Sequence, residues 1–307
     1  MSEIYDVIIL GAGPAGLAAG LYAGRSRLNV LIIEKGQDGG QIAITDEIEN
    51  YPGQIVEGES GPSLIARMTE QAEKFGAKRV SDMIKEVELE GEVKVLKSEK
   101  NEYRGKNVII ATGAHARPIG CKGEGQFRGK GVSYCATCDG AFFRNKVTAV
   151  VGGGNVALED AIFLSRMCKK VYLIHRRDEF RGAKILQDEV KKNDKIEILW
   201  NTIVTKIDGD EVVEGLHIQD VDNHVDKLLD VDGIFIAVGT KPASELLSGK
   251  LSTDEKGYII AGEDGVTNIP GIFAAGDGRS KNLRQVVTAV SDGANCVYSV
   301  ERYLQNA

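Results

Sequence analysis

The sequence predicts an α/β protein made of two Rossmann-like nucleotide-binding domains, with the second inserted into the first. Three observations predict this fold. A glycine-rich turn separates an apolar run from a helical pattern at residues 11–16, and again at residues 152–157. Each half later contains a strand that runs into a glycine turn: a strand at residues 108–111 precedes the turn at 112–113, and a strand at residues 234–238 precedes the turn at 239–240. The final block, residues 244–307, has no nucleotide turn of its own, so we expect it to pack onto the first half.

The first unit starts with an apolar, β-branched strand at residues 4–10. Leu17 and Leu21 then recur at helical spacing, and residues 29–33 form a second strand closed by Glu34. This order is the βαβ arrangement in which a glycine turn carries a nucleotide.

The second unit repeats this order further along the chain. Residues 147–151 are predicted to form a strand, residues 158–167 a helix, and residues 171–174 the next strand. The final block adds a strand at residues 272–275 and a helix that carries apolar residues on one face. Two nucleotide folds of one architecture therefore share the chain.

Three segments follow from this organisation. Residues 1–114 are predicted to be the first part of the outer domain, residues 115–243 the inserted domain, and residues 244–307 the second part of the outer domain. The two joints are expected near residues 114–118 and 240–243, where glycine and proline break the strands. Because the joints lie side by side in this topology, we expect a hinge.

Composition excludes several classes of protein. The chain has 307 residues, with 38 Lys and Arg against 45 Asp and Glu, and a net charge of −7 makes nucleic acid an unlikely partner. The uncharged run at residues 7–24 contains several glycines and Pro14 and lacks a basic start, so a strand, turn and helix explain it better than a membrane or signal segment. Five cysteines without a signal segment argue against a secreted disulfide framework, and we expect a cytoplasmic protein.

The first glycine turn fits the full dinucleotide pattern. Gly11 allows the tight turn, Gly13 lets a pyrophosphate approach the backbone, and Gly16 lets the helix pack closely on the strand. Glu34 lies where a carboxylate accepts a hydrogen bond from a ribose 2′-hydroxyl and repels a 2′-phosphate. This turn is therefore predicted to bind FAD or NAD and not NADP.

The second turn has alanine in place of the third glycine, which the pattern tolerates. No acid follows its second strand. His175 stands there instead, with Arg176, Arg177 and Arg181. Guanidinium groups pair with phosphate dianions in a forked geometry, so at this position we favour the 2′-phosphate of NADPH over a merely solvated basic run.

Cys135 and Cys138 form a C-x-x-C motif followed by Asp139. Half a zinc site is improbable, because the remaining cysteines and the histidines are scattered, and no metal is expected. A disulfide closing so small a loop stabilises little through chain entropy, so a redox pair is the favoured interpretation. Asp139 is then the group that shuttles a proton between sulfurs, against the alternative of a plain turn residue before Gly140.

The order of these parts resembles the low-molecular-weight bacterial thioredoxin reductases over almost the whole chain. The motifs that carry the resemblance are GAGPAG, GGQ at 39–41, ENYPG at 49–53, ATG at 111–113, CATCDG, GGGNVA, HRRDEFR and AAGD. The resemblance implies FAD contacts at Gly11, Gly13, Pro14, Ala15, Gly16, Glu34, Gly40, Gln41, Asn50, Asp277, Arg284 and Gln285. It implies NADPH contacts at Gly152, Gly154, Asn155, Ala157, His175, Arg176, Arg177 and Arg181.

The same resemblance implies a reaction. Hydride passes from NADPH to FAD, then to the Cys135–Cys138 disulfide, and the dithiol reduces oxidised thioredoxin or a thioredoxin-like protein. Within the family Cys138 faces the flavin, Cys135 attacks the partner disulfide and Asp139 is the acid. The family also implies a homodimer and a domain rotation between the half-reactions.

Several alternatives stay open. A related reductase could take electrons from ferredoxin or F420, or could serve another thioredoxin-like acceptor, and a dithiol oxidase would share the layout. A peroxiredoxin-system reductase should have a further N-terminal domain. In a different class, the chain could be a flavin redox sensor without turnover, although no segment is left over for docking a partner.

Overall fold

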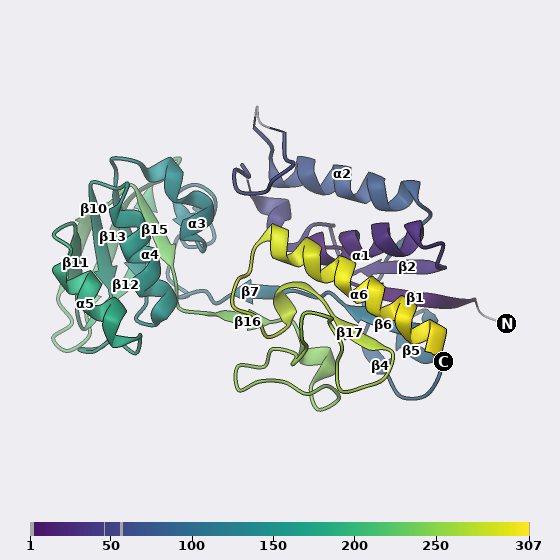
Figure 1. Ribbon diagram of the computed structural model, residues 1–307. Coiled ribbons are helices and arrows are strands. Elements are labelled where there is room, and N and C mark those ends of the chain that lie inside the picture. Colours follow the sequence, from purple (N-terminus) through teal and green to yellow (C-terminus); the bar gives the residue numbers. More distant parts are fainter. Residues whose placement is uncertain (1–2, 46, 56–57, 307) are drawn as a thin grey trace. The chain divides into compact units, whose positions relative to one another are not determined.

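The computed structural model describes residues 3–45, 47–55 and 58–306 and divides into two compact units (Figure 1). One unit comprises Met1–His115 and Lys241–Ala307, and the other comprises Ala116–Thr240. The predicted fold class, α/β with one nucleotide-type domain inserted into another, is therefore confirmed. The nucleotide that each unit binds stays a prediction.

The outer unit is built on a largely parallel sheet with strand order β3-β2-β1-β6-β5-β4, and β17 also pairs with β6. Its strands are β1 (Ile4–Leu10), β2 (Val30–Glu34), β3 (Lys78–Ser81), β4 (Glu86–Glu88), β5 (Lys94–Lys97), β6 (Glu102–Ile110) and β17 (Ile272–Ala274). Its helices are α1 (Pro14–Arg25), α2 (Gly61–Lys74) and α6 (Val286–Asn306), with short 3-10 helices η1 (Gly40–Ile44), η3 (Glu245–Leu247) and η4 (Gly276–Gly278).

Strand alternation divides the core of this unit into two layers. Val7 and Ile9 of β1 point to one face, where they pack with buried residues of α1, α2 and α6 (Figure 1). Ile8 and Leu10 point to the other face, toward β4, β5 and the segment around Leu247. Every one of these four side chains is at most 7% exposed, so both faces of β1 are covered.

One long strand ties the end of the chain to its beginning. β6 pairs with β1 along one edge, and along its other edge residues 102–105 pair with β5 while residues 108–110 pair with β17. The strand starts at Glu102, earlier than the strand expected at residues 108–111. The extra residues pair with β5, whereas β17 pairs with residues 108–110, so β6 joins the last strand of the chain to the first sheet.

The inserted unit has a five-stranded parallel sheet, order β11-β10-β9-β15-β8, and a separate antiparallel sheet, order β12-β13-β14. Its strands are β8 (Val132–Ser133), β9 (Val147–Val151), β10 (Lys170–Ile174), β11 (Ile196–Leu199), β12 (Thr202–Gly209), β13 (Val213–Asp220), β14 (Asp226–Asp230) and β15 (Gly233–Ile236). Its helices are α3 (Ala136–Asp139), η2 (Gly140–Phe143), α4 (Asn155–Ser165) and α5 (Lys184–Lys192). Helix α4 begins at Asn155, earlier than the helix expected from residue 158.

Two short paired strands join the units, where the sequence suggested broken strands. They are β7 (Ala114–Ala116) and β16 (Thr240–Pro242), which form a two-stranded sheet. Gly113 and Gly239 precede them with positive φ values of 71° and 104°. The chain thus crosses between the units twice, through strands paired with each other.

Candidate functional site

Two glycines of the first turn are required by the chain itself. Gly11 has a φ of 111°, and a Cβ there would lie 2.4 Å from the carbonyl oxygen of Ala111. A Cβ on Gly16 would lie 1.8 Å from the carbonyl oxygen of Gly11. Strand β1, the turn and helix α1 therefore pack as closely as the nucleotide-binding pattern predicts.

Gly13 has a different reason to be glycine. Its φ of −75° suits any residue, and among the described residues other than its two chain neighbours no atom lies within 4 Å of the place of a Cβ. Neither backbone strain nor packing within the chain explains it, so we attribute it to open space beside the N-terminus of α1. A pyrophosphate fits that space, because the first turn of a helix offers unpaired N–H groups to an anion.

Glu34 closes the turn at the end of β2. One carboxylate oxygen accepts from the Ala12 N–H at 2.8 Å and the other accepts from the Gly36 N–H at 3.2 Å. The carboxylate is thus held beside the glycine turn, as expected for a ribose contact. Pro14 and Ala15 follow as the first residues of α1.

Other residues predicted to contact FAD come together from distant parts of the outer unit. The Asn50 amide donates to the Gln285 side-chain oxygen at 3.2 Å, and the Gln41 amide lies 3.0 Å from the His115 ring nitrogen. Gly40 has a φ of 56° and lies beside Gln41 at the start of η1.

Asp277 presents an orphan carboxylate oxygen. Its Oδ1 is buried without a hydrogen-bond partner in the described part of the chain, and burial raises the pKa of this carboxyl group. A buried oxygen of this kind calls for a donor from outside the chain. A ribityl hydroxyl is such a donor, so the open space at Gly13 and the orphan oxygen of Asp277 both fit a bound FAD.

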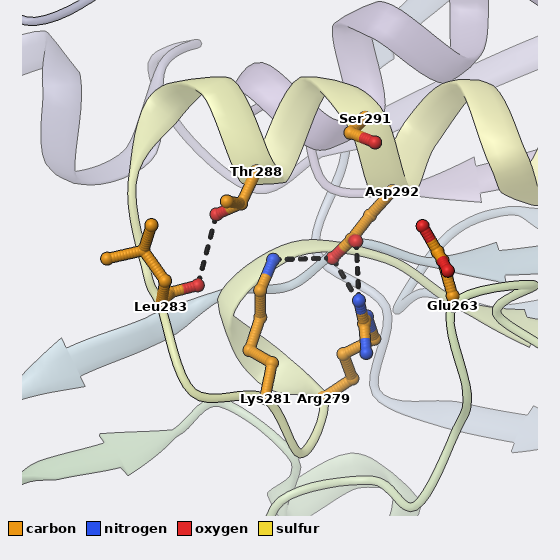
Figure 2. Close-up of a pocket in the computed structure, with 7 residues that line it drawn as sticks. All are labelled: Glu263, Arg279, Lys281, Leu283, Thr288, Ser291 and Asp292. Atoms are coloured by element: carbon orange, nitrogen blue, oxygen red, sulfur yellow. Dashed lines mark hydrogen bonds and ion pairs between the residues drawn. The ribbon is translucent and has the colours of Figure 1, made fainter.

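The loop that carries Asp277 is fixed by Asp292 on α6, a residue that the sequence did not single out. Asp292 accepts from the Gly276 N–H at 2.9 Å. It also accepts from Arg279 at 2.9 and 2.6 Å and from Lys281 at 2.8 Å (Figure 2). Burial would raise the pKa of Asp292, but the two cations outweigh it and hold the pKa below its usual range. A cavity of about 280 Å³ adjoins this cluster, lined by Glu263, Arg279, Lys281, Leu283, Thr288, Ser291 and Asp292.

Arg284 also contacts the loop that carries Asp277. Its guanidinium donates to the Asp277 carbonyl at 3.3 Å and stacks 4.0 Å from the centre of the Tyr258 ring. A contact between Arg284 and FAD stays a prediction.

The second glycine turn repeats the design of the first. Gly152 has a φ of 156°, and a Cβ there would lie 2.5 Å from the carbonyl oxygen of Ala237. Gly154 has a φ of −94°, and apart from its two chain neighbours the described part of the chain has no atom within 4 Å of the place of a Cβ, so there is room for a second pyrophosphate. Ala157 is fully buried where α4 packs on the sheet.

The loop after β10 is hydrogen-bonded to this turn. The Arg181 N–H donates to the Gly153 carbonyl at 2.8 Å, and the Asn155 side-chain oxygen accepts from the Ala183 N–H at 2.8 Å. Arg176, Arg177 and Arg181 are all exposed. The backbone of the loop that carries the three arginines is therefore bonded to the nucleotide turn, and the arginines are exposed to solvent.

His175 is placed differently from its arginine neighbours. It is 6% exposed, and a Cβ on Gly153 would lie only 2.2 Å from its ring. Its Nε2 lies 3.0 Å from the Glu179 carbonyl, and burial followed by the nearby arginines lowers its pKa. His175 thus packs inside the arginine loop, and a direct contact with NADPH stays a prediction.

The C-x-x-C motif is closed as a disulfide between Cys135 and Cys138, with Cα atoms 5.3 Å apart. Cys135 precedes α3, and its carbonyl accepts from the N–H groups of Cys138 and Asp139 at 3.2 and 3.1 Å. The Asp139 carboxylate lies 2.5 Å from the Ser133 hydroxyl. The redox interpretation of the motif requires a disulfide between the two cysteines, and the structure has it. Asp139 places a carboxylate on α3, the short helix that also carries Cys138.

Sequence reasoning missed three groups. Ser133 stands two residues before Cys135 and could have been noticed for its spacing. Asp160 on α4 is buried enough, with Glu159 adding repulsion, to raise its pKa to about 7. Neither Asp160 nor Asp292 carries a sequence signal, because their roles depend on packing. Within the described ranges, no helix is long and apolar enough to cross a membrane, and no metal-binding cluster of His, Cys, Asp or Glu is found.

Comparison with known proteins agrees with this geometry. The family model described as "Pyridine nucleotide-disulphide oxidoreductase" matches residues 5–293. A thioredoxin reductase of Peptoclostridium acidaminophilum is 47% identical over 311 residues, covering 99% of this chain and 98% of that protein.

Solved structures give the same result. The thioredoxin reductase of Streptococcus pyogenes matches with a TM-score of 0.94 and 44% identity over 99% of both chains. A ferredoxin-flavin thioredoxin reductase of Clostridium acetobutylicum matches with a TM-score of 0.52 and 29% identity over 99% of both chains. On the family model and on these relatives, the chain belongs to the pyridine nucleotide-disulphide oxidoreductases.

Proposed function

We propose that this protein is an NADPH-dependent thioredoxin-disulfide reductase of class EC 1.8.1.9. The observation that carries the proposal is the Cys135–Cys138 disulfide next to Asp139, in a unit that also holds a nucleotide turn and an exposed arginine loop. The identity of the relatives over nearly the whole chain supports the same activity.

FAD is the group we propose for the outer unit. Gly11, Gly13 and Gly16 with Glu34 would hold its adenosine diphosphate part, and Asp277 would accept from its ribityl chain. Gly40, Gln41, Asn50, Arg284 and Gln285 complete the proposed set. When bound, the flavin supplies two-electron transfer between a reduced nicotinamide and a disulfide.

NADPH is the donor we propose for the inserted unit. Gly152 and Gly154 leave its pyrophosphate room at the N-terminus of α4, with Asn155 and Ala157 as the first turn of that helix. Arg176, Arg177 and Arg181 would pair with the 2′-phosphate, since they are exposed on a loop that is bonded to the turn.

The chemistry at the sulfurs follows from thiol–disulfide exchange. In the reduced protein the Cys135 thiolate attacks a sulfur of oxidised thioredoxin, and the other thioredoxin sulfur leaves with the bonding electron pair. Cys138 then attacks Cys135, which restores the enzyme disulfide and releases reduced thioredoxin. Asp139 supplies and takes back the proton that these steps exchange.

We further propose that the inserted unit rotates between the half-reactions. Its two connections run through β7 and β16, each preceded by a glycine of positive φ, and such short connections can act as a hinge. A crosslink that holds the units together should stop turnover without removing the flavin; unchanged turnover would refute the rotation.

A homodimer, a cytoplasmic location and thioredoxin or a thioredoxin-like protein as partner complete the proposal, on the strength of the family.

The activity can be tested with a single variant. Purified protein should be yellow and should oxidise NADPH only when thioredoxin is added. Replacing Cys138→Ser should abolish electron transfer to thioredoxin while NADPH still reduces the flavin, because the variant keeps the nucleotide turns. Thioredoxin reduction that survives in this variant, followed as NADPH absorbance at 340 nm, would exclude the assigned route.

A ferredoxin-fed reductase is the second candidate, because one relative of known structure carries that description. The exposed arginine loop favours NADPH over it. Anaerobic stopped-flow measurements with NADPH, NADH and reduced ferredoxin as separate donors should show fast flavin reduction with NADPH alone.

A further inference from the structure

Ser133 is a buried serine whose hydroxyl contacts the proposed acid and the backbone of Cys135. It lies on β8, is 5% exposed, and precedes Cys135 by two residues. Its Oγ lies 2.5 Å from Asp139 Oδ2, accepts from the Cys135 N–H at 3.1 Å, and lies 3.4 Å from the Cys135 carbonyl oxygen. One side chain thus touches both the proposed acid and the backbone of the proposed nucleophile.

The number of hydrogen bonds that a hydroxyl can donate and accept determines the direction of each of these contacts. A serine has one hydrogen to donate and two lone pairs that accept. With Asp139 ionised, the hydrogen points to the carboxylate, because a charged acceptor at 2.5 Å is far stronger than a carbonyl at 3.4 Å. The Cys135 N–H then uses one lone pair.

The same three contacts remain satisfied when Asp139 carries a proton. The Asp139 O–H can donate to Ser133 Oγ, and the serine hydrogen can turn to the Cys135 carbonyl. Both lone pairs and the one hydrogen are then in use. Neither state needs α3 or the Cys135 backbone to move, so the acid can exchange its proton at fixed geometry.

We propose that Ser133 is a positioning residue that holds Asp139 beside the dithiol in both of its protonation states. The inference rests on the proposed function, because it assigns the acid role to Asp139. As a sulfur leaves as a thiolate, protonated Asp139 gives it a proton, and the serine hydrogen turns to the new carboxylate. When the next thiol loses its proton in order to attack, Asp139 takes up that proton. The Ser133–Asp139 pair then returns to its starting protonation state, so over the cycle it neither gains nor loses a proton.

The test measures the dithiol half-reaction separately. Protein reduced beforehand is mixed with oxidised thioredoxin, and the loss of enzyme thiols is followed in single turnover across pH 5 to 9. Replacing Ser133→Ala should slow exchange by at least about tenfold, the effect of losing one hydrogen bond to a charged group. It should also move the rate profile to higher pH, because the carboxylate loses the hydrogen bond that Ser133 donates and its pKa rises. Ser133→Thr, which keeps a hydroxyl, should restore both.

Three further variants separate positioning from folding. Ser165→Ala is the matched control, because Ser165 is also a buried serine of this unit, bonded to Ile162 and Asn193, and it should leave the profile unchanged. In an Asp139→Asn background, Ser133→Ala should cause little additional loss, since the two residues act through one proton. The pH profile of the exchange rate is also measured for an Asp160→Asn variant. Helix α4 packs against α3 and carries the titratable acidic residues Glu159 and Asp160.

The outcomes are distinct. Additive losses in the double variant, or a Ser133→Ala profile that keeps its position on the pH axis, would overturn the proposal. Should Ser133→Ala fail to fold, a Ser133→Thr protein with a shifted profile would overturn it equally. Because pre-reduced protein is used, a failure of NADPH to act as donor would affect the proposed function and leave this test intact.

Discussion

The two glycine turns share a backbone and differ in what the next strand brings to it. Leu10 pairs with Ile33 before the first turn, and Val151 pairs with Ile174 before the second. The first glycine of each turn donates to the carbonyl of that partner, at 2.9 and 3.1 Å. The residue after each partner is therefore structurally equivalent, and it is Glu34 in one unit and His175 in the other.

These equivalent residues use the turn in opposite ways. Glu34 reaches back with its carboxylate to the Ala12 N–H, whereas the His175 ring covers Gly153, which stands where the first turn has Ala12. In the second unit a different group of the turn is bonded, since the Gly153 carbonyl accepts from the N–H groups of Arg181 and Gly182. The comparison teaches that one backbone turn can be combined with opposite side-chain chemistry at the end of the second strand, and on the proposed function that end is where the two ribose contacts would differ.

The largest expected effect is the difference in stability between two substitutions in the first turn, one at a glycine that the packing of the chain requires and one at a glycine that it does not require. Replacing Gly11→Ala should destabilise the outer unit by at least about 3 kcal/mol, because it combines a positive φ with a clash on a backbone carbonyl. Replacing Gly13→Ala should change stability by less than about 0.5 kcal/mol yet weaken flavin binding, because only the space of the pyrophosphate is filled.

Thermal unfolding of flavin-free protein, with flavin retention measured by absorbance, checks both expectations. The pair Gly152→Ala and Gly154→Ala should repeat the pattern in the inserted unit with NADPH affinity as the readout. A Gly13→Ala protein with wild-type flavin affinity would contradict the assignment of that space.

The parts of the molecule that sequence predicted well are those with a local cause. Strands 4–10 and 147–151 match β1 and β9 residue for residue, because apolar β-branched runs next to glycine turns leave little choice. The burial of His175 could not be predicted from the three arginines beside it, because it results from packing of the ring against Gly153 and the loop backbone. Ser133 and Asp292 likewise act through contacts that only the folded chain creates.

The second prediction concerns the arginine loop. Replacing Arg176→Ala and Arg177→Ala together should raise the KM for NADPH roughly 10- to 100-fold, because each loses a charge-assisted bond to phosphate, and should leave NADH unaffected. Arg166→Ala, an exposed arginine at the end of α4, is the control. Equal losses for NADPH and NADH in steady-state kinetics would show that the loop does not read the 2′-phosphate.

The smallest expected effect concerns another pair of equivalent positions. Three residues after the last position of each turn, α1 has fully buried Ala19 and α4 has Asp160. Burial first, and then Glu159, raises the pKa of Asp160 to about 7 from 3.8. Between about pH 4 and 7 the folded protein therefore holds a proton that the unfolded chain has released, so stability falls as the pH rises through this window and stays lower above it.

Replacing Asp160→Asn should remove that fall. At pH 8 the variant should be more stable than the parent by about 1 to 3 kcal/mol, while near pH 4 the two should differ little. Asp188→Asn on α5, which removes an exposed acid from the same unit, controls for net charge. The melting temperature of flavin-free protein at several pH values checks this, and a parent-like slope in the Asn variant would mean that α4 tolerates an ionised acid where α1 has alanine.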